Sequence, residues 1–182
     1  YKIYPDRVQR PDKKTIFLKE DNPIIIAGRL IQEDLLILHW DNNFQEHILE
    51  GGILCFPALW TLNEKINKPL SRIHKPVEQY NEKITKSVQR MFNNLKVDKP
   101  IWRANWYLYK DPELFSPLSE KFSHTTEKEY FEGDFWVRVE RQTLNRLPIT
   151  NAILFGIHTY VVNKKQLTLK QITSLKNYSL NK

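Results

Sequence analysis

Hydrophobic residues follow two different periods along this chain, one typical of strands and one typical of helices. Continuous or alternating apolar runs predict strands at 35–38, 48–56, 101–109, 135–142 and 151–162. In the fourth run, Arg138, Glu140 and Gln142 share one face, while Val137 and Val139 take the other. Glycines at 51 and 52 interrupt the second run, which indicates a bulge or the close approach of another group.

The clearest helical pattern runs from about 78 to 95, with Glu, Lys and Gln between the apolar positions. Those apolar positions are Tyr80, Ile84, Val88, Met91, Phe92 and Leu95. Two pairs have capping-box spacing, Thr61 with Glu64 and Thr168 with Gln171, and predict short helices near 62–67 and near the C-terminus. A turn at 147–151 predicts an antiparallel hairpin between the last two strands.

The order of these elements is strands, then helices, then strands. It predicts an α+β fold with a largely antiparallel sheet and helices on one side. Such an arrangement is compatible with a PAS-like sheet, although the pattern alone does not select it. Residues 1–29 are polar apart from a short "IIIAG" run. Without a repeat, low-complexity tract or linker, residues 1–182 are expected to form one domain.

Charge and composition narrow the classes of function. The chain has 182 residues and a formal net charge of +7, but its basic residues are spread out, with no block of five or more, so nucleic-acid binding is not expected. No apolar run reaches the roughly 18 residues of a membrane span. The single cysteine, Cys55, lies in an apolar run, which predicts a buried thiol and fits a reducing, cytoplasmic location.

Common catalytic motifs are absent, including the dinucleotide and P-loop fingerprints and the zinc-protease motif. No two of the five histidines have the i, i+4 spacing of a helical metal pair; they are His39, His47, His74, His124 and His158. A heme needs only one axial imidazole, an apolar pocket and cations for its carboxylates. His74 and His158 are the candidates, and for each a structural, hydrogen-bonded role is the alternative.

Arginines and carboxylates inside the predicted strands are the other candidates. Arg103, Arg138 and Arg141 are costly to bury unless paired. Their partner is either a protein carboxylate, such as Glu140, or an anionic ligand group. The adjacent Glu33 and Asp34 are either capping or edge residues, or a carboxylate pair that holds an ammonium group or moves protons. A basic-patch function would require the three arginines to face solvent together.

Several segments together resemble the heme-dependent oxidative N-demethylase family, the alpha subunits of dimethylamine-monooxygenase-like enzymes. They are "LIQEDLLIL", "FPALWTLNEKINKPLSRIHKPV", "RANW" and "WVRVERQTLNRLPITNAILFGIHTYV", between about 24 and 162, with "RVERQTLNRLP" the most specific. The resemblance implies a PAS-like fold that holds heme b, and oxidation of a small secondary methylamine by O2 with loss of formaldehyde. It also implies partner subunits that carry flavin (FMN), a [2Fe-2S] cluster and tetrahydrofolate. One cysteine cannot hold such a cluster here, so electrons must come from an external reductase or ferredoxin-like partner.

The resemblance also implies roles for individual residues. His74 is the first choice for the proximal heme ligand, oriented by Pro76 and the helix that follows, and His158 is the second. Contacts to the heme carboxylates or on the substrate side are implied for Arg103, Arg138 and Arg141. Trp106 and Tyr107 would line the pocket, and Glu33 and Asp34 would hold the amine or relay protons. The family's histidine motif has a second proline where this chain has Glu78.

Two other functions fit the same resemblance. One is a non-catalytic PAS-like heme module that senses a gas or a redox state. The other is a relative that has kept the fold and lost the heme. The matched segments are flanked by shorter terminal portions than the family suggests, so the chain can also be a fragment of a longer family member.

Overall fold

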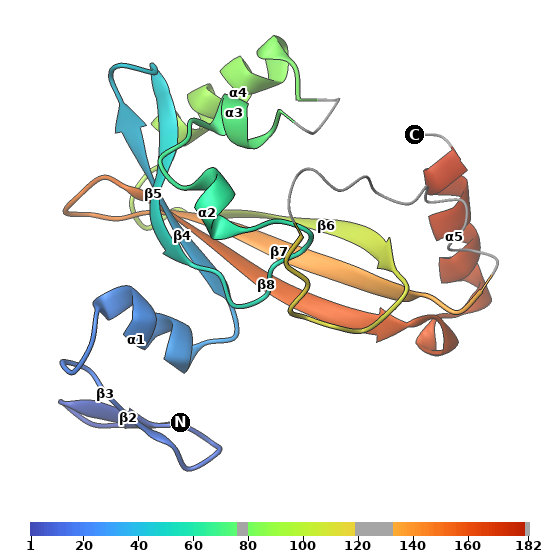
Figure 1. Ribbon diagram of the computed structural model, residues 1–182, viewed down its shortest axis with the longest axis horizontal. Helices are drawn as coiled ribbons and strands as arrows, with labels where there is room; N and C mark the ends of the chain where they lie inside the picture. The colour runs from blue at the N-terminus through green and yellow to red at the C-terminus, as the bar shows by residue number, and fades with distance from the viewer. Residues whose placement is uncertain (76–79, 119–132, 181–182) are drawn as a thin grey trace.

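Five long strands form one antiparallel sheet at the centre of the computed structural model, which describes residues 1–75, 80–118 and 133–180 (Figure 1). The spatial order of the strands is β5-β4-β8-β7-β6. Their bounds are Asp34–Asp41 (β4), Glu46–Ile53 (β5), Ile101–Tyr109 (β6), Trp136–Arg146 (β7) and Ile153–Asn163 (β8). All five predicted strands are confirmed, and so is the hairpin turn, where the Leu147 amide bonds the Ala152 carbonyl at 2.9 Å.

Gly51 and Gly52 in β5 lie at a bulge and at a close approach of the neighbouring strand, the two features that the sequence predicted. The pairing of β4 with β5 shifts between Ile37, which faces Gly51, and Leu38, which faces Leu49. Glu50 is therefore the extra residue of a bulge. A β-carbon at Gly52 would lie 2.8 Å from the Leu35 carbonyl oxygen, so the two strands approach too closely there for a side chain.

Strand register divides the side chains of the sheet between two faces. Cross-strand partners share a face, so Gln142 lies with Ile157 and Arg103, while Arg141 lies with His158. The face that carries Gln142, Ile157 and Arg103 is called the α4 face, because three helices lie on it: α2 (Leu62–Lys65), α3 (Leu70–Ile73) and α4 (Glu82–Asn94). Its core joins the helices to the strands through Leu38, Leu70, Phe92, Leu95 and Ile153.

The second face, which we call the α5 face, also carries helices. Leu175 of α5 (Leu169–Leu180) packs with Leu167 against Leu108 and Val137. At the other end of this face, Gly28 of α1 (Pro23–Leu30) lies against the side chain of Ile53. The prediction of helices on one side is therefore wrong, whereas the α+β class and the flanking helices are confirmed.

Local hydrogen bonds set the ends of the helices. The Asn81 side chain accepts a bond from the Ile84 amide at 3.1 Å, so α4 begins at Glu82 instead of near 78, and Tyr80 precedes it. The predicted residues 78 and 79 lie outside the described part of the chain. Thr61 does not cap α2, because its hydroxyl donates to the Glu64 carboxylate at 2.9 Å. The capping box of Thr168 and Gln171 is confirmed.

The first 30 residues contain elements that the sequence did not predict. Three strands of two or three residues form a small sheet, β1 (Lys2–Ile3), β2 (Arg7–Gln9) and β3 (Thr15–Phe17), and α1 follows. Helix α1 starts at Pro23 because Asn22 caps it. A 3-10 turn, η2 (Lys164–Gln166), links β8 to α5. Within the described ranges, no helix is long and apolar enough to cross a membrane.

Candidate functional site

His74 lies at the C-terminal end of α3, where a backbone carbonyl orients its ring. Its Nδ1 lies 2.9 Å from the Leu70 carbonyl oxygen. A carbonyl can only accept, so Nδ1 carries the proton and donates, and in the neutral ring Nε2 keeps a lone pair. The ring also stacks on Tyr80, with centroids 4.3 Å apart and planes 16° from parallel. These two contacts give an imidazole that is held in one orientation, as a metal ligand requires.

The surroundings of His74 favour its neutral form. Burial lowers the pKa of His74, and the positive charges of Lys65 and Arg103 lower it further, while the bond to Leu70 acts in the opposite direction. A neutral imidazole is the form that binds iron. Residues 76–79, including the predicted orienting residue Pro76 and the variant position Glu78, lie outside the described residues.

Arg103 lies on the α4 face of the edge strand β6, on the same side of the sheet as α3. The side chain is exposed, and its Nε donates to Gln142 Oε1 at 2.9 Å. Its charge acts on both His74 and Tyr80, whose pKa is raised by burial and by Glu46 and lowered by Arg103. Tyr107, two pairs further along the same face, is 43% exposed. The fold therefore places the charge of Arg103 within reach of the candidate ligand, and an exposed aromatic ring lies four residues further along the same face of β6.

Arg138 also projects on the α4 face, but its side chain is buried and bonded to groups of the protein interior. The residue is 1% exposed, and its guanidinium donates to the Leu114 carbonyl at 3.2 Å and to the Phe56 carbonyl at 2.5 Å. Its Nε lies 3.5 Å from Glu140 Oε1, an ion pair without hydrogen-bond geometry. Of the two partners that the sequence left open for Arg138, the structure shows the protein carboxylate.

Asp34 is buried beside this arginine. The residue is 1% exposed, and Oδ1 accepts from the Cys55 and Phe56 amides at 2.6 and 2.8 Å. Burial raises the pKa of Asp34 to about 6, against the opposing effect of the two backbone bonds. Cys55 is half-buried, whereas a buried thiol was predicted, and burial together with the Asp34 charge raises the pKa of this thiol.

Other predicted residues gather on the α5 face, on the far side of the sheet from His74. Glu33 Oε1 lies 3.2 Å from Arg141 Nη2 and 3.8 Å from His158 Nδ1. A β-carbon at Gly156 would lie 2.7 Å from Glu33 Oε2, so the absence of a side chain there lets this carboxylate lie against the strand. Trp106, also on this face, packs on Tyr178 with ring centroids 5.3 Å apart.

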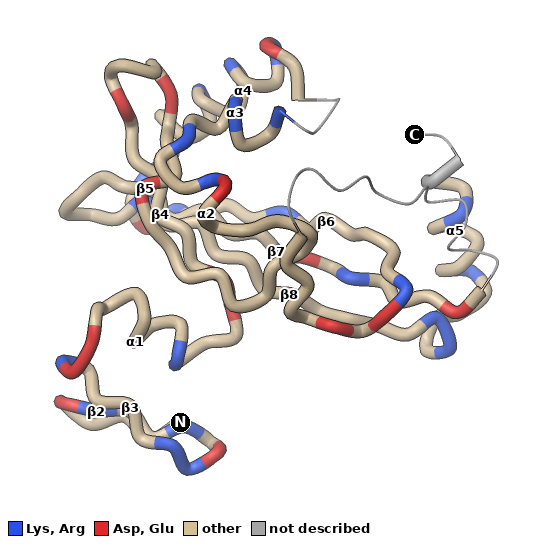
Figure 2. Tube along the Cα trace, in the orientation of Figure 1, with Lys and Arg blue, Asp and Glu red and all other residues tan. Residues whose placement is uncertain are grey.

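The predicted residues therefore do not form one site. His74, Arg103, Tyr107, Arg138 and Asp34 project on the α4 face, and Glu33, Trp106, Arg141 and His158 lie on the α5 face. Glu33 and Asp34 are not brought together as a carboxylate pair. The basic-patch alternative is excluded because Arg138 is buried and the other two arginines lie on opposite faces. Figure 2 likewise shows basic residues scattered over many elements.

Two other histidines have structural partners, and a third lies outside the described residues. His47 Nδ1 bonds Gln89 Oε1 at 2.8 Å, and the ring packs edge-on against Phe92. His39 Nε2 lies 3.3 Å from the Thr150 carbonyl oxygen. His124 lies in the undescribed range 119–132. In the described ranges, no three His, Cys, Asp or Glu side chains are grouped to hold a metal ion.

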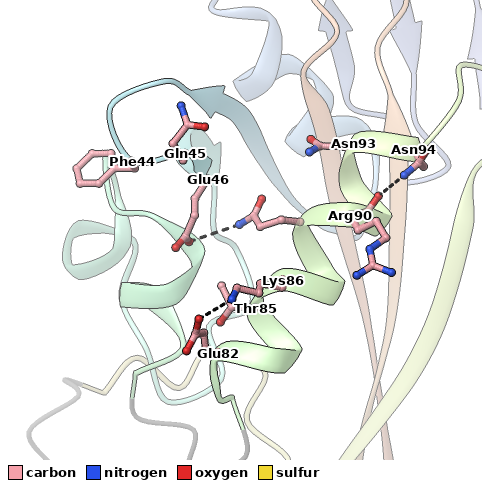
Figure 3. A pocket seen from close by; sticks show the side chains of 10 residues that line it. Phe44, Gln45, Glu46, Glu82, Thr85, Lys86, Arg90, Asn93 and Asn94 are labelled. Atoms are coloured by element: carbon pink, nitrogen blue, oxygen red, sulfur yellow. Dashed lines mark hydrogen bonds and ion pairs between the residues drawn. The ribbon is translucent and has the colours of Figure 1, made fainter.

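A groove of about 490 Å³ lies between the β4–β5 turn and α4 (Figure 3). An ion pair of Glu82 with Lys86 crosses its wall at 2.6 Å, and Gln89 donates to Glu46 at 3.4 Å. Apart from Phe44 the lining residues have polar side chains, and none is a histidine; they are Phe44, Gln45, Glu46, Glu82, Thr85, Lys86, Gln89, Arg90, Asn93 and Asn94. This groove therefore lacks the axial ligand that a heme would need.

The sequence did not single out two residues beside the candidate ligand. Tyr80 was predicted as a helical core position, and Gln142 was assigned only to a face of its strand. A signal for Gln142 was present, because three alternate positions of β7 that face the core are polar. No comparable signal marked Tyr80.

Comparison with known families agrees with the residues that first suggested a resemblance. The family model described as haem-dependent oxidative N-demethylase, alpha subunit-like, matches residues 6–176. The match covers nearly the whole chain, including α3 with His74 and the strands β6 to β8. Its description is that of a subunit of a heme-dependent oxidoreductase. The chain therefore belongs to the haem-dependent oxidative N-demethylase, alpha subunit-like family.

Proposed function

We propose that this chain binds heme b on the α4 face of its sheet, with His74 as the axial ligand. The observation that carries the proposal is the ring of His74, whose Nδ1 is held by the Leu70 carbonyl while Nε2 keeps its lone pair. The nearby Arg103 is a cation for a heme carboxylate, and the exposed Tyr107 ring is a wall for a flat ligand. An axial imidazole and a cation are thus present for the group that the family description names.

We further propose that the protein is the heme-bearing subunit of an oxidative N-demethylase for a small secondary methylamine. Heme, when bound, would supply the iron centre that activates O2; overall, the N-methyl amine, O2, two electrons and two protons would give the demethylated amine, formaldehyde and water. The chain itself orients the heme through His74 and balances its carboxylate charge through Arg103. The family description as alpha subunit-like supports partner subunits, for which we propose a reductase with FMN and a [2Fe-2S] cluster and a tetrahydrofolate-dependent protein.

A PAS-like fold and a cytoplasmic location belong to the same proposal. Helices inserted between the second and third strands of the antiparallel sheet support the first. The single, half-buried thiol suits the second. The α5 face is not part of the proposed heme site, so Glu33, Trp106, Arg141 and His158 have no cofactor role in it.

An absorption spectrum tests the proposal directly. Protein produced with heme supplied is expected to show a Soret band, and His74→Ala is expected to abolish it or change the axial signature. His158→Ala is the matched control, because it removes a histidine from the other face and should leave the spectrum unchanged. A wild-type protein without heme would support a relative that kept only the fold, and a spectrum altered only by His158→Ala would make His158 the ligand.

Substrate addition separates an enzyme from a sensor. Dimethylamine added to the ferric heme protein is expected to shift the Soret band, because a cationic or neutral amine near the iron changes its surroundings. The same titration with sodium chloride at equal ionic strength is the control. A spectrum that does not respond to the amine but responds to a gaseous ligand would favour the heme sensor.

A further inference from the structure

An unusual row of polar residues runs along β7 on the face that packs towards the helices. Arg138, Glu140 and Gln142 take alternate positions there, where a core-facing strand normally carries apolar side chains. Arg138 is 1% exposed and Glu140 is 8% exposed. Burying such groups costs free energy unless each is paired.

Hydrogen bonds and an ion pair link this row from the interior to the edge of the sheet. Arg138 is anchored by two carbonyls and by Thr159 Oγ1 at 3.5 Å. Its Nε faces Glu140 Oε1 at 3.5 Å, and Glu140 Oε2 accepts from Gln142 Nε2 at 3.3 Å. Gln142 Oε1 then accepts from Arg103 Nε at 2.9 Å. The chain of contacts thus ends at the exposed guanidinium of Arg103, whose charge acts on His74.

The direction of the Gln142 amide is set by both neighbours. An ionised carboxylate only accepts and a guanidinium only donates, so the NH2 group must face Glu140 and the carbonyl oxygen must face Arg103. The buried row therefore fixes the one acceptor that holds Arg103 Nε. Of the nitrogens of the Arg103 side chain, only Nε has a hydrogen-bond partner among the described residues, so the two terminal Nη atoms are donors that can bind an anion.

We infer that Gln142 is a positioning residue, held by Glu140, which orients the guanidinium of Arg103 towards a carboxylate of the bound heme. This inference rests on the proposed heme site. It assigns the polar row a purpose that packing alone does not require: a preorganised Arg103 loses less conformational freedom when it binds the carboxylate.

A double-mutant cycle on heme affinity tests the inference. Heme is titrated into the apoprotein and binding is followed by absorption, for wild type, Gln142→Met, Arg103→Ala and the double variant. Methionine keeps the length of glutamine without its hydrogen bonds. Gln142→Met is expected to weaken heme binding roughly 5–20-fold when Arg103 is present, and less than about twofold in the Arg103→Ala background.

Two controls separate positioning from a loss of structure. Asn145→Ala lies on the same strand but faces the other side, and it should leave heme affinity unchanged within about twofold. Glu140→Gln keeps the size of the side chain and lets the Gln142 amide turn over, so a loss of roughly 2–5-fold is expected, again only with Arg103 present. Melting curves test whether each variant is folded, and only folded variants enter the comparison.

The possible outcomes distinguish this inference from the function on which it rests. Equal losses for Gln142→Met with and without Arg103 would overturn positioning, because Gln142 would then act independently. No loss in either background would overturn it as well. Failure of the wild-type protein to bind heme would overturn the proposed function and the inference with it. A loss of heme affinity that occurs only when Arg103 is present supports both the inference and the proposed function.

Discussion

At the scale of single residues, Asp34 shows how burial can make stability depend on pH. The carboxyl group is 1% exposed, and burial raises its pKa from 3.8 to about 6, although the Cys55 and Phe56 amides stabilise the charged form. A raised folded-state pKa means that the folded protein binds the proton more tightly than the unfolded chain. The contribution of the protonated Asp34 to the free energy of unfolding is therefore fully present below pH 3.8 and is lost as the pH rises through 6, a difference of about 3 kcal/mol.

Asp34→Asn is expected to remove this dependence. The amide oxygen can still accept from the two backbone amides, and the side chain can no longer ionise. Urea unfolding of the two proteins between pH 4 and 7.5 measures it: the stability of Asp34→Asn relative to wild type should rise with pH by up to about 3 kcal/mol. Asp12→Asn, at an exposed position, is the control and should show no such trend. Parallel curves for Asp34→Asn and wild type would contradict the raised pKa.

At the scale of elements, Arg146 ties the end of β7 to the end of α4. Its guanidinium donates to the Leu95 and Phe92 carbonyls at the C-terminal end of the helix, and to the Asn151 carbonyl at 2.8 Å in the hairpin turn. A cation at this end also interacts favourably with the helix dipole. One side chain thus fixes the orientation of α4, which packs on the sheet through Phe92.

Arg146→Ala is expected to destabilise the protein by about 2–4 kcal/mol and lower its melting temperature by roughly 5–15 °C. Three carbonyls lose a charged donor, and two of them lie at a packed helix end. Thermal melting followed by circular dichroism measures the change. Arg90→Ala, on the exposed side of the same helix, is the control and should change stability by less than about 0.5 kcal/mol. An equal effect of the two substitutions would show that Arg146 does not secure α4.

The length of an element decided how well the sequence predicted it. The long strands and α4 repeat their apolar period several times, so their existence was predictable, and only their ends were displaced. Strands β1 to β3 have two or three residues each, too few to show a period. The start of α4 was misplaced because the Asn81 cap outweighs the apolar Tyr80, which belongs to the loop and stacks on His74 instead.

At the scale of the whole molecule, the candidate site depends on which face each strand turns towards the helices. Alternation in β7 already separates Arg138 from Arg141, so these two arginines could have been placed on different faces from the sequence. The separation of His74 from His158 on opposite faces could not have been predicted from the sequence, because it depends on how α3 packs on the sheet. Only the fold brings the charge of Arg103 within reach of His74, from segments about 30 residues apart.

Hydrogen exchange can locate the bound heme on one of the two faces. Heme on the α4 face would contact α3 and β6, and ligand binding raises the cost of opening the elements that it touches. Addition of heme is therefore expected to slow amide exchange in 70–75 and in β6 (Ile101–Tyr109), measured by mass spectrometry of peptides. Helix α5, on the other face, and β1 to β3 serve as internal controls and should keep their rates. Because Leu175 of α5 packs against β7, heme beside His158 would change exchange in β8 and α5 and leave 70–75 unaffected, which would contradict the proposed site.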